Sequence, residues 1–102
     1  DKMQRGLKNA IQLPLKTMRL GDQAWDAICE TDIYGNQAYK SDTQVCARAL
    51  ETGILGAYQN VLINIVDLKV EGFKVEILAE AEAIMARATK KCAEVLAILD
   101  KH

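Results

Sequence analysis

Residues 41–67, SDTQVCARALETGILGAYQNVLINIVD, constrain the fold more than any other part of the chain. Their start carries Ser41 and, three residues later, a glutamine at the spacing of a capping box, while Asp42 suits the positive end of the helix dipole. From Ala49 onward nearly every direction around the helix axis carries an apolar or small residue. A helix that is apolar all round is typical of a protein interior, so we predict a buried central helix over about residues 43–66.

Two glycines in this segment indicate a close neighbour. Gly53 and Gly56 each cost about 1 kcal/mol relative to alanine inside a helix, which is understandable where another backbone passes close. The segment is not a membrane span, because polar residues interrupt it. A helix buried on all sides needs about four neighbours, and the rest of the chain offers two. We therefore expect the chain to be part of a larger helical domain, one subunit of a tight oligomer, or both.

Two further helices are predicted around this one. The first runs from residue 3 to about 32, and Pro14 inside it should kink it or split it in two. The third runs from about 70 to 101 and is amphipathic. Gly35 and Asn36 predict a turn before the central helix. Apolar residues recur at helical spacing at Leu7, Ile11, Leu15, Met18, Trp25 and Ile28, and then at Phe73, Ile77, Ala81, Ile84, Ala88, Cys92, Val95 and Leu99. The predicted class is an all-α, multi-helical bundle.

Composition excludes several classes of function. The chain has 102 residues and a net charge of -1, which suits one small soluble domain and gives no reason to expect nucleic acid or a membrane as partner. Three widely spaced cysteines, Cys29, Cys46 and Cys92, argue against a disulfide framework and for a reducing cytoplasm. The single histidine is His102, so we expect no zinc site and no Ser-His or Cys-His nucleophile pair.

Polar residues of the central helix are the candidates for function. Asp42 either caps the helix or presents a carboxylate beside free backbone donors to a ligand. Arg48 either pairs with Glu51 or Asp42 or faces a ligand carboxylate. Asn60 and Asn64 share a face and either hydrogen-bond between helices or recognise a polar heterocycle. These residues alone name no reaction.

The string GNQAYKSDTQVCARALETGILGAYQNVLIN resembles the cyclodeaminase domain of the formiminotransferase-cyclodeaminase family. The similarity runs from about residue 7 to 99. Its features are Pro14-Leu15, Gly35-Asn36, Ser41-Asp42, Ala49-Leu50, Gly53, Gly56-Ala57 and the segment from Asn60 to Asn64. The resemblance implies a helical, dimer-forming domain of which residues 1–102 are the C-terminal part. The family's glycine-rich segment and catalytic aspartate belong to an upstream half that is absent here, so Asp42 does not inherit that role and the catalytic residue is unknown.

The reaction that the resemblance implies is closure of 5-formiminotetrahydrofolate to 5,10-methenyltetrahydrofolate with release of ammonia, a lyase step of histidine degradation. A tetrahydrofolate derivative is then the substrate, and no metal is implied. Lys40 and Arg48 are candidates for the glutamate tail of the folate, with Asp42, Asn60 and Asn64 as further substrate-binding residues. The alternatives are a methenyltetrahydrofolate cyclohydrolase of the same family or a non-catalytic helical dimerisation module. Expected partners are the folate, the missing half of the domain and a second copy, as a homodimer or larger homo-oligomer; the chain alone should be inactive.

Overall fold

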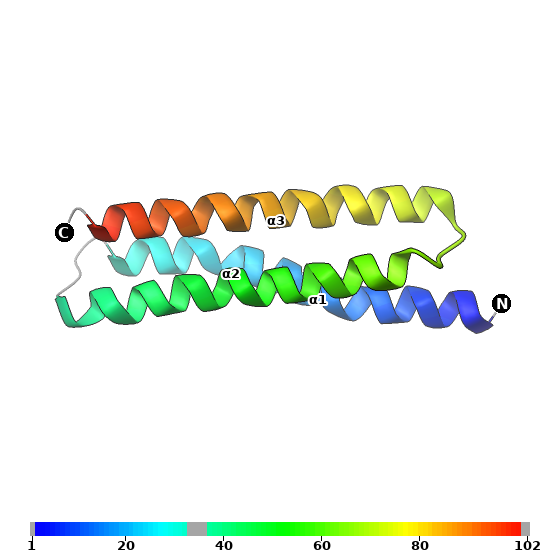
Figure 1. Cartoon of the computed structure of the whole chain (residues 1–102), viewed down its shortest axis with the longest axis horizontal. Coiled ribbons are helices and arrows are strands. Elements are labelled where there is room, and N and C mark those ends of the chain that lie inside the picture. Colours follow the sequence, from blue (N-terminus) through cyan, green and yellow to red (C-terminus); the bar gives the residue numbers. More distant parts are fainter. Residues whose placement is uncertain (1, 33–36, 101–102) are drawn as a thin grey trace.

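The structure is a computed structural model that describes residues 2–32 and 37–100. It consists of α1 (Lys2–Asp32), α2 (Gln37–Ile65) and α3 (Glu71–Asp100). The helices lie side by side, with α2 antiparallel to both α1 and α3 (Figure 1). The bundle measures 55 × 18 × 17 Å, so each helix extends along most of its length. The predicted all-α class is confirmed, and the described residues contain no strand.

Pro14 lies in the interior of α1, yet the helix is continuous from Lys2 to Asp32. The prediction that Pro14 splits this helix is therefore wrong, while the kink stays a prediction. A proline inside a helix removes one backbone donor and crowds the carbonyl one turn earlier. Ile11, Leu15 and Met18 on either side of it are all buried, and their packing holds the helix together across the proline.

The α2 helix begins at Gln37, about six residues before the start predicted from the capping signal. Ser41 therefore lies inside the helix, and its predicted role as the N-cap is wrong. Residues 37–40 include Gln, Ala and Lys, which favour helix, so the helix extends back past the local cap signal. The α3 helix starts one residue after its predicted start, and Lys101, Gly35 and Asn36 lie outside the described residues.

The core runs along the centre of the bundle, where the three helices meet. Its largest fully buried side chains include Trp25 on α1 and Ile54 on α2. The predicted apolar face of α3 is confirmed from Ile77 to Leu99, whereas Phe73 is only half-buried at its edge. Cys92 belongs to this buried face and carries a free thiol, while the free thiol of Cys46 is exposed.

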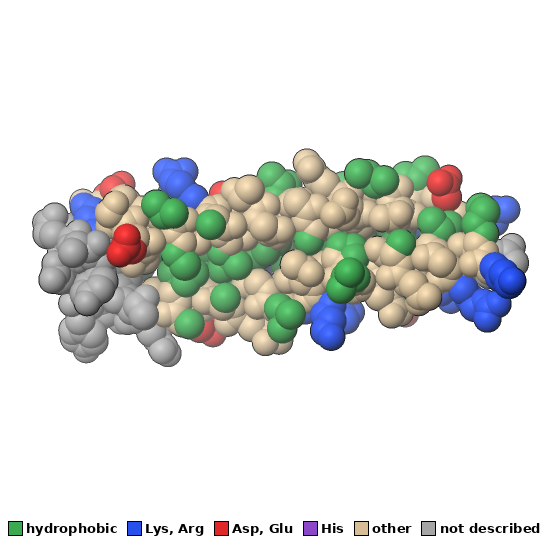
Figure 2. All heavy atoms as spheres, turned by 90° about the horizontal axis from the view of Figure 1, so that it is seen from below, with side chains coloured by type: hydrophobic (Ala, Val, Ile, Leu, Met, Phe, Trp, Pro, Cys, Tyr) green, Lys and Arg blue, Asp and Glu red, His purple; other side chains and the backbone are tan. Residues whose placement is uncertain are grey.

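One side of α2 is not covered within this chain, as expected for a helix with only two neighbours, and its burial on all sides in a larger assembly stays a prediction. An inner stripe packs into the core, and it consists of Ala47, Ile54, Ala57, Val61 and Ile65. The opposite side of the helix is exposed, and we call it the outer stripe; it consists of Val45, Ala49, Thr52, Gly56, Gln59, Ile63 and, just after the helix, Val66. Two neighbouring helices cover only part of the circumference of α2. Figure 2, seen from the side of α1 and α2, shows hydrophobic side chains spread along the length of the bundle.

Candidate functional site

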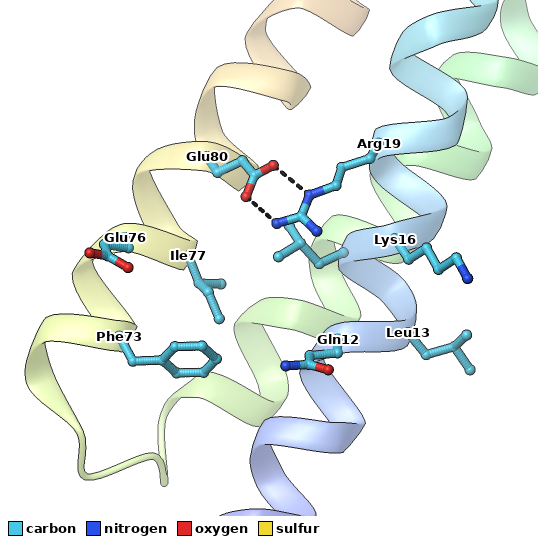
Figure 3. Close-up of a pocket in the computed structure, with 9 residues that line it drawn as sticks. Gln12, Leu13, Lys16, Arg19, Phe73, Glu76, Ile77 and Glu80 are labelled. Atoms are coloured by element: carbon cyan, nitrogen blue, oxygen red, sulfur yellow. Dashed lines mark hydrogen bonds and ion pairs between the residues drawn. The ribbon is translucent and has the colours of Figure 1, made fainter.

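A groove of about 620 Å³ lies between α1 and α3 (Figure 3). Its lining consists of Gln12, Leu13, Leu15, Lys16 and Arg19 from α1 and Phe73, Glu76, Ile77 and Glu80 from α3. Leu15 and Ile77 are buried and form its apolar base. The groove therefore combines an apolar base with an aromatic ring, an amide and charges of both signs.

Arg19 and Glu80 close one end of the α1–α3 groove with a two-pronged ion pair. Arg19 Nε donates to Glu80 Oε2 and Arg19 Nη2 donates to Glu80 Oε1, each at 2.6 Å. This hydrogen bonding raises the pKa of Arg19 and lowers the pKa of Glu80 below its ordinary value, against a smaller opposing effect of burial. Glu80 is therefore ionised at neutral pH, which makes it a poor general acid.

Phe73 supplies the flat wall at the other end of the groove. Figure 3 shows its ring pointing from α3 toward Gln12 on α1. Lys8 Nζ lies 4.9 Å from the ring centroid, a cation–π contact that helps to hold the ring in this position. An aromatic face next to an amide is suited to stacking and hydrogen-bonding a planar heterocycle.

The five residues predicted to bind substrate all lie on α2, outside the α1–α3 groove. Lys40 and Asn64 mark the two ends of the set and lie about 36 Å apart along the helix axis, at 1.5 Å per residue. One small ligand cannot contact both ends. The structure therefore does not bring these five residues together into one site.

Asn60 lines a second groove, of about 340 Å³, between α1 and α2. The other lining residues are Leu13, Pro14, Thr17, Gly53, Gly56 and Ala57. Asn64 Nδ2 donates to the backbone oxygen of Asn60 at 2.8 Å, which confirms that the two residues share a face. Asn60 is exposed and Asn64 is half-buried, and among the described residues neither amide bonds to another helix, so the expected hydrogen bonds between helices are not found within this chain.

Asp42 and Arg48 are both exposed on α2. The predicted pairing of Arg48 with Glu51 or Asp42 is wrong, because no ion pair joins them among the described residues. Glu51 and Arg48 instead affect the buried thiol of Cys92. Burial and then Glu51 raise the pKa of Cys92, and Arg48 opposes them. The alternative for Arg48, contact with a ligand carboxylate, stays a prediction.

Sequence reasoning missed the α1–α3 groove because its charged residues stand at the edges of amphipathic helices, where charge is ordinary. The order of positive and negative residues along α1 and α3 was a weak indication that these helices pair. Arg19 and Asp22 lie one turn apart on α1, and Glu80 and Arg87 lie two turns apart on α3. Two parallel helices can match these signs, and Arg87 Nη2 indeed lies 2.8 Å from Asp22 Oδ2. Only the structure supplies the register that pairs them.

Within residues 2–32 and 37–100, no three or more His, Cys, Asp or Glu side chains are grouped so that they could hold a metal ion. Over the same residues, none of the helices combines the length and apolarity needed to cross a membrane.

Comparison with known proteins decides the family. The model of the formiminotransferase-cyclodeaminase family matches residues 1–83. The chain is 40% identical over 98 residues, 96% of its length, to the formimidoyltransferase-cyclodeaminase of Dictyostelium discoideum. This chain belongs to the formiminotransferase-cyclodeaminase family. The resemblance found in the sequence is thereby confirmed.

Two further relatives of the same name show similar agreement. Identity is 40% over 98 residues with the protein of Rattus norvegicus and 39% over 94 residues with that of Sus scrofa, covering 96% and 92% of this chain. The chain spans 18% of the length of the Dictyostelium and rat proteins and 17% of the pig protein. The comparison therefore concerns a limited part of each relative.

Proposed function

We propose that this chain is the C-terminal part of a cyclodeaminase domain that acts on tetrahydrofolate derivatives in the cytoplasm. The observation that carries this proposal is the 40% identity over 96% of the chain to proteins named formimidoyltransferase-cyclodeaminase. The reaction would close 5-formiminotetrahydrofolate to 5,10-methenyltetrahydrofolate and release ammonia. The remaining helices of the domain would come from an upstream segment.

The chemistry requires a proton donor. The folate N10 attacks the formimino carbon and forms a new C–N bond, and the former imino nitrogen takes up protons and leaves as ammonia. Of the two carboxyls that line the α1–α3 groove, Glu80 is hydrogen-bonded to Arg19, which lowers its pKa and keeps it ionised. We therefore propose that the acid belongs to another part of the domain, so that this chain alone does not turn over substrate.

The α1–α3 groove is the place we propose for the planar part of the folate. Phe73 offers a face for stacking on a pterin, and Gln12 opposite it can exchange hydrogen bonds with the ring edge. The ionised carboxylate of Glu80 can accept from the amino and ring N–H donors of a pterin. Lys16 on the rim is a cation for the glutamate tail.

The residues predicted from the sequence provide a second candidate place. The α1–α2 groove beside Asn60 could hold the heterocycle, with Asn64 next to it. Arg48 lies about 18 Å from Asn60 along α2, a separation that suits an elongated ligand with a carboxylate tail. Asp42 and Lys40 lie about 27 Å or more from Asn60 along the axis, so we assign them at most to the end of such a tail.

A non-catalytic helical dimerisation module is the second candidate function. The exposed outer stripe of α2 favours it, because monomeric proteins rarely leave a long apolar face uncovered. Both readings include a homo-oligomer. They differ in whether the chain binds a reduced folate.

Equilibrium dialysis of the 102-residue chain against tetrahydrofolate tests the proposal. We expect binding that weakens in Lys16→Ala and Phe73→Leu and is unchanged in the control Lys90→Ala, on the exposed side of α3. Loss of binding in Asn60→Ala alone would move the site to the α1–α2 groove. No binding by the wild-type chain would contradict the folate proposal and leave the dimerisation module. For the complete domain, absorbance of methenyltetrahydrofolate formed from the formimino substrate, with release of ammonia, separates cyclodeaminase from cyclohydrolase.

A further inference from the structure

We propose that Glu80 selects the ligand of the α1–α3 groove by accepting two adjacent N–H donors from the edge of a planar heterocycle, and that Arg19 takes the place of this edge in the ligand-free chain. The ligand class is a 2-amino-4-oxopyrimidine ring fused to a second ring, of which a pterin is one example. The inference rests on the proposed function for its site, the groove assigned there to the folate. It adds an exchange, because the ligand must displace Arg19 from Glu80 when it binds.

The contact between Arg19 and Glu80 has the form of a contact with such a ligand. Arg19 presents Nε–H and Nη2–H side by side, and they reach Glu80 Oε2 and Oε1 at 2.6 Å each. The amino group and the neighbouring ring N–H of a 2-amino-4-oxopyrimidine are likewise two donors on one carbon. A carboxylate accepts such a pair through both of its oxygens. Because the two oxygens of Glu80 can face one donor pair at a time, Arg19 and the heterocycle compete for them.

The rest of the groove suits a ring system whose edge lies at Glu80. Phe73 precedes Glu80 by seven residues, which is two turns or about 10.5 Å along α3. This separation accommodates a two-ring heterocycle that stacks on Phe73 and hydrogen-bonds to Glu80. The buried Ile77 and Leu15 form the apolar base of the groove, and Figure 3 shows Ile77 between Phe73 and Glu80 on α3. The flat faces of the ring therefore meet apolar atoms, and its donor edge meets the carboxylate.

The ion pair is weak enough to be exchanged. The side chains of Arg19 and Glu80 are 52% and 38% exposed, and an ion pair in water contributes little to stability. The displaced guanidinium of Arg19 stays at the surface, where water solvates it. Glu80 remains an ionised acceptor without Arg19, because the ordinary pKa of its carboxyl, 4.5, is already well below neutral pH.

A second ion pair between the same two helices supplies an internal comparison. Arg87 Nε and Nη2 donate to Asp22 Oδ1 and Oδ2 at 3.0 and 2.8 Å. Neither residue belongs to the lining of the α1–α3 groove. Both ion pairs hold α1 against α3, but only the pair of Arg19 and Glu80 occupies the groove. The effect of losing an ion pair between helices can therefore be separated from the effect of freeing Glu80.

Binding of free pterin to the 102-residue chain, measured by equilibrium dialysis with the fluorescence of pterin as readout, tests the proposal. Arg19→Met keeps an apolar stem and removes the donors, so it should tighten pterin binding about two- to fivefold. Glu80→Gln removes the charged acceptor and should weaken binding about tenfold or more. The matched control is Arg87→Met, which breaks the second ion pair and should leave pterin binding unchanged.

Lumazine is the control ligand, because a carbonyl oxygen replaces the 2-amino group of pterin in an otherwise equal ring system. A carbonyl oxygen cannot donate to a carboxylate. Lumazine should therefore bind the wild-type chain more weakly than pterin and should gain nothing from Arg19→Met. Circular dichroism verifies that the three helices persist in each variant.

Unchanged or weaker pterin binding in Arg19→Met would overturn the exchange. Unchanged binding in Glu80→Gln, equal binding of lumazine, or no pterin binding by both the wild type and Arg19→Met would also overturn it. Dialysis against tetrahydrofolate is judged separately. If tetrahydrofolate binds and its binding depends on Phe73, while Arg19→Met brings no gain, the folate proposal stands and the exchange fails. If pterin follows the expected order and tetrahydrofolate does not bind, the folate proposal fails and the exchange stands.

Discussion

The inner and outer stripes of α2 are both apolar in sequence, and only their surroundings differ. The inner stripe, with Ile54 and Val61, is buried against α1 and α3. The outer stripe, with Val45 and Ile63, is exposed. The period of apolar residues therefore indicated correctly that α2 has more apolar surface than one face. The count of helices also indicated that this chain covers only part of that surface, but it did not indicate which side stays exposed.

Gly21 and Gly56 show the same difference between a packed and an exposed position. Gly21 is required by the packing of this chain, because Ile54 fills the space that a side chain would occupy. Gly56 stands in open space. In the sequence both glycines simply occur within regular helices. The structure shows that packing inside this chain explains Gly21 and does not explain Gly56.

The largest expected effect is the loss of folding stability when Ile54 of the inner stripe is truncated, compared with the same truncation of Ile63 in the outer stripe. Ile54→Ala removes a fully buried side chain and should lower the free energy of unfolding by about 2–5 kcal/mol. Ile63→Ala should change it by about 0.5 kcal/mol or less in dilute, monomeric protein. Urea denaturation followed by circular dichroism measures both. Equal losses would contradict the assignment of the two stripes.

Substituting alanine for Gly21 and for Gly56 should change the stability of the folded chain in opposite directions. Gly21→Ala forces Ile54 to move and should destabilise the chain by about 1–3 kcal/mol. Gly56→Ala should stabilise the monomer by about 1 kcal/mol, because it improves helix propensity without a clash. Thermal unfolding at low concentration tests the pair, and a neutral Gly21→Ala would show that the α1–α2 contact is looser than described.

The two described cysteines extend the comparison to reactivity. Cys46 is exposed on α2, whereas Cys92 is buried and has a raised pKa, mainly because of burial. Iodoacetamide reacts with the thiolate, so Cys46 should be alkylated much faster than Cys92 in the folded chain. Peptide mass spectrometry over time measures each rate, and urea should bring the rates together. Rapid labelling of Cys92 without denaturant would argue against the described core.

The smallest effect concerns the ion pair between Arg19 and Glu80, whose side chains are 52% and 38% exposed. Glu80→Gln should lower the free energy of unfolding by at most about 1 kcal/mol at neutral pH. Because the pKa of Glu80 is lowered in the folded state, its contribution is present above the ordinary value of 4.5 and is lost as the pH falls through the folded pKa. Urea denaturation across this range tests the sign, with Glu76→Gln as control; a cost that grows toward acid would contradict it.

Much of the fold could be predicted because apolar spacing is a local property. The face of α3 from Ile77 to Leu99 was predicted correctly, since burial repeats every three to four residues there. The start of α2 was misplaced because a plausible cap at Ser41 competes with good helix formers before it. The split at Pro14 was wrong because tertiary packing of its neighbours outweighs a local helix breaker.

The site was harder to predict than the fold. The α1–α3 groove depends on the register of two helices more than 60 residues apart in sequence, as in the pair Arg19–Glu80. No local pattern specifies that register. The candidates chosen from α2 instead rested on the premise that Asn60 and Asn64 are buried, which holds only if another chain or segment covers the helix.

Arginine substitutions in the two stripes of α2 test the account most directly. Ile54→Arg places a charge in the core and should abolish the cooperative unfolding transition, whereas Ile63→Arg on the exposed side should leave the three helices and their free energy of unfolding nearly unchanged. Circular dichroism and urea denaturation of dilute protein measure both variants. Loss of the helical bundle in Ile63→Arg, or a stably folded Ile54→Arg, would contradict the assignment of the two stripes.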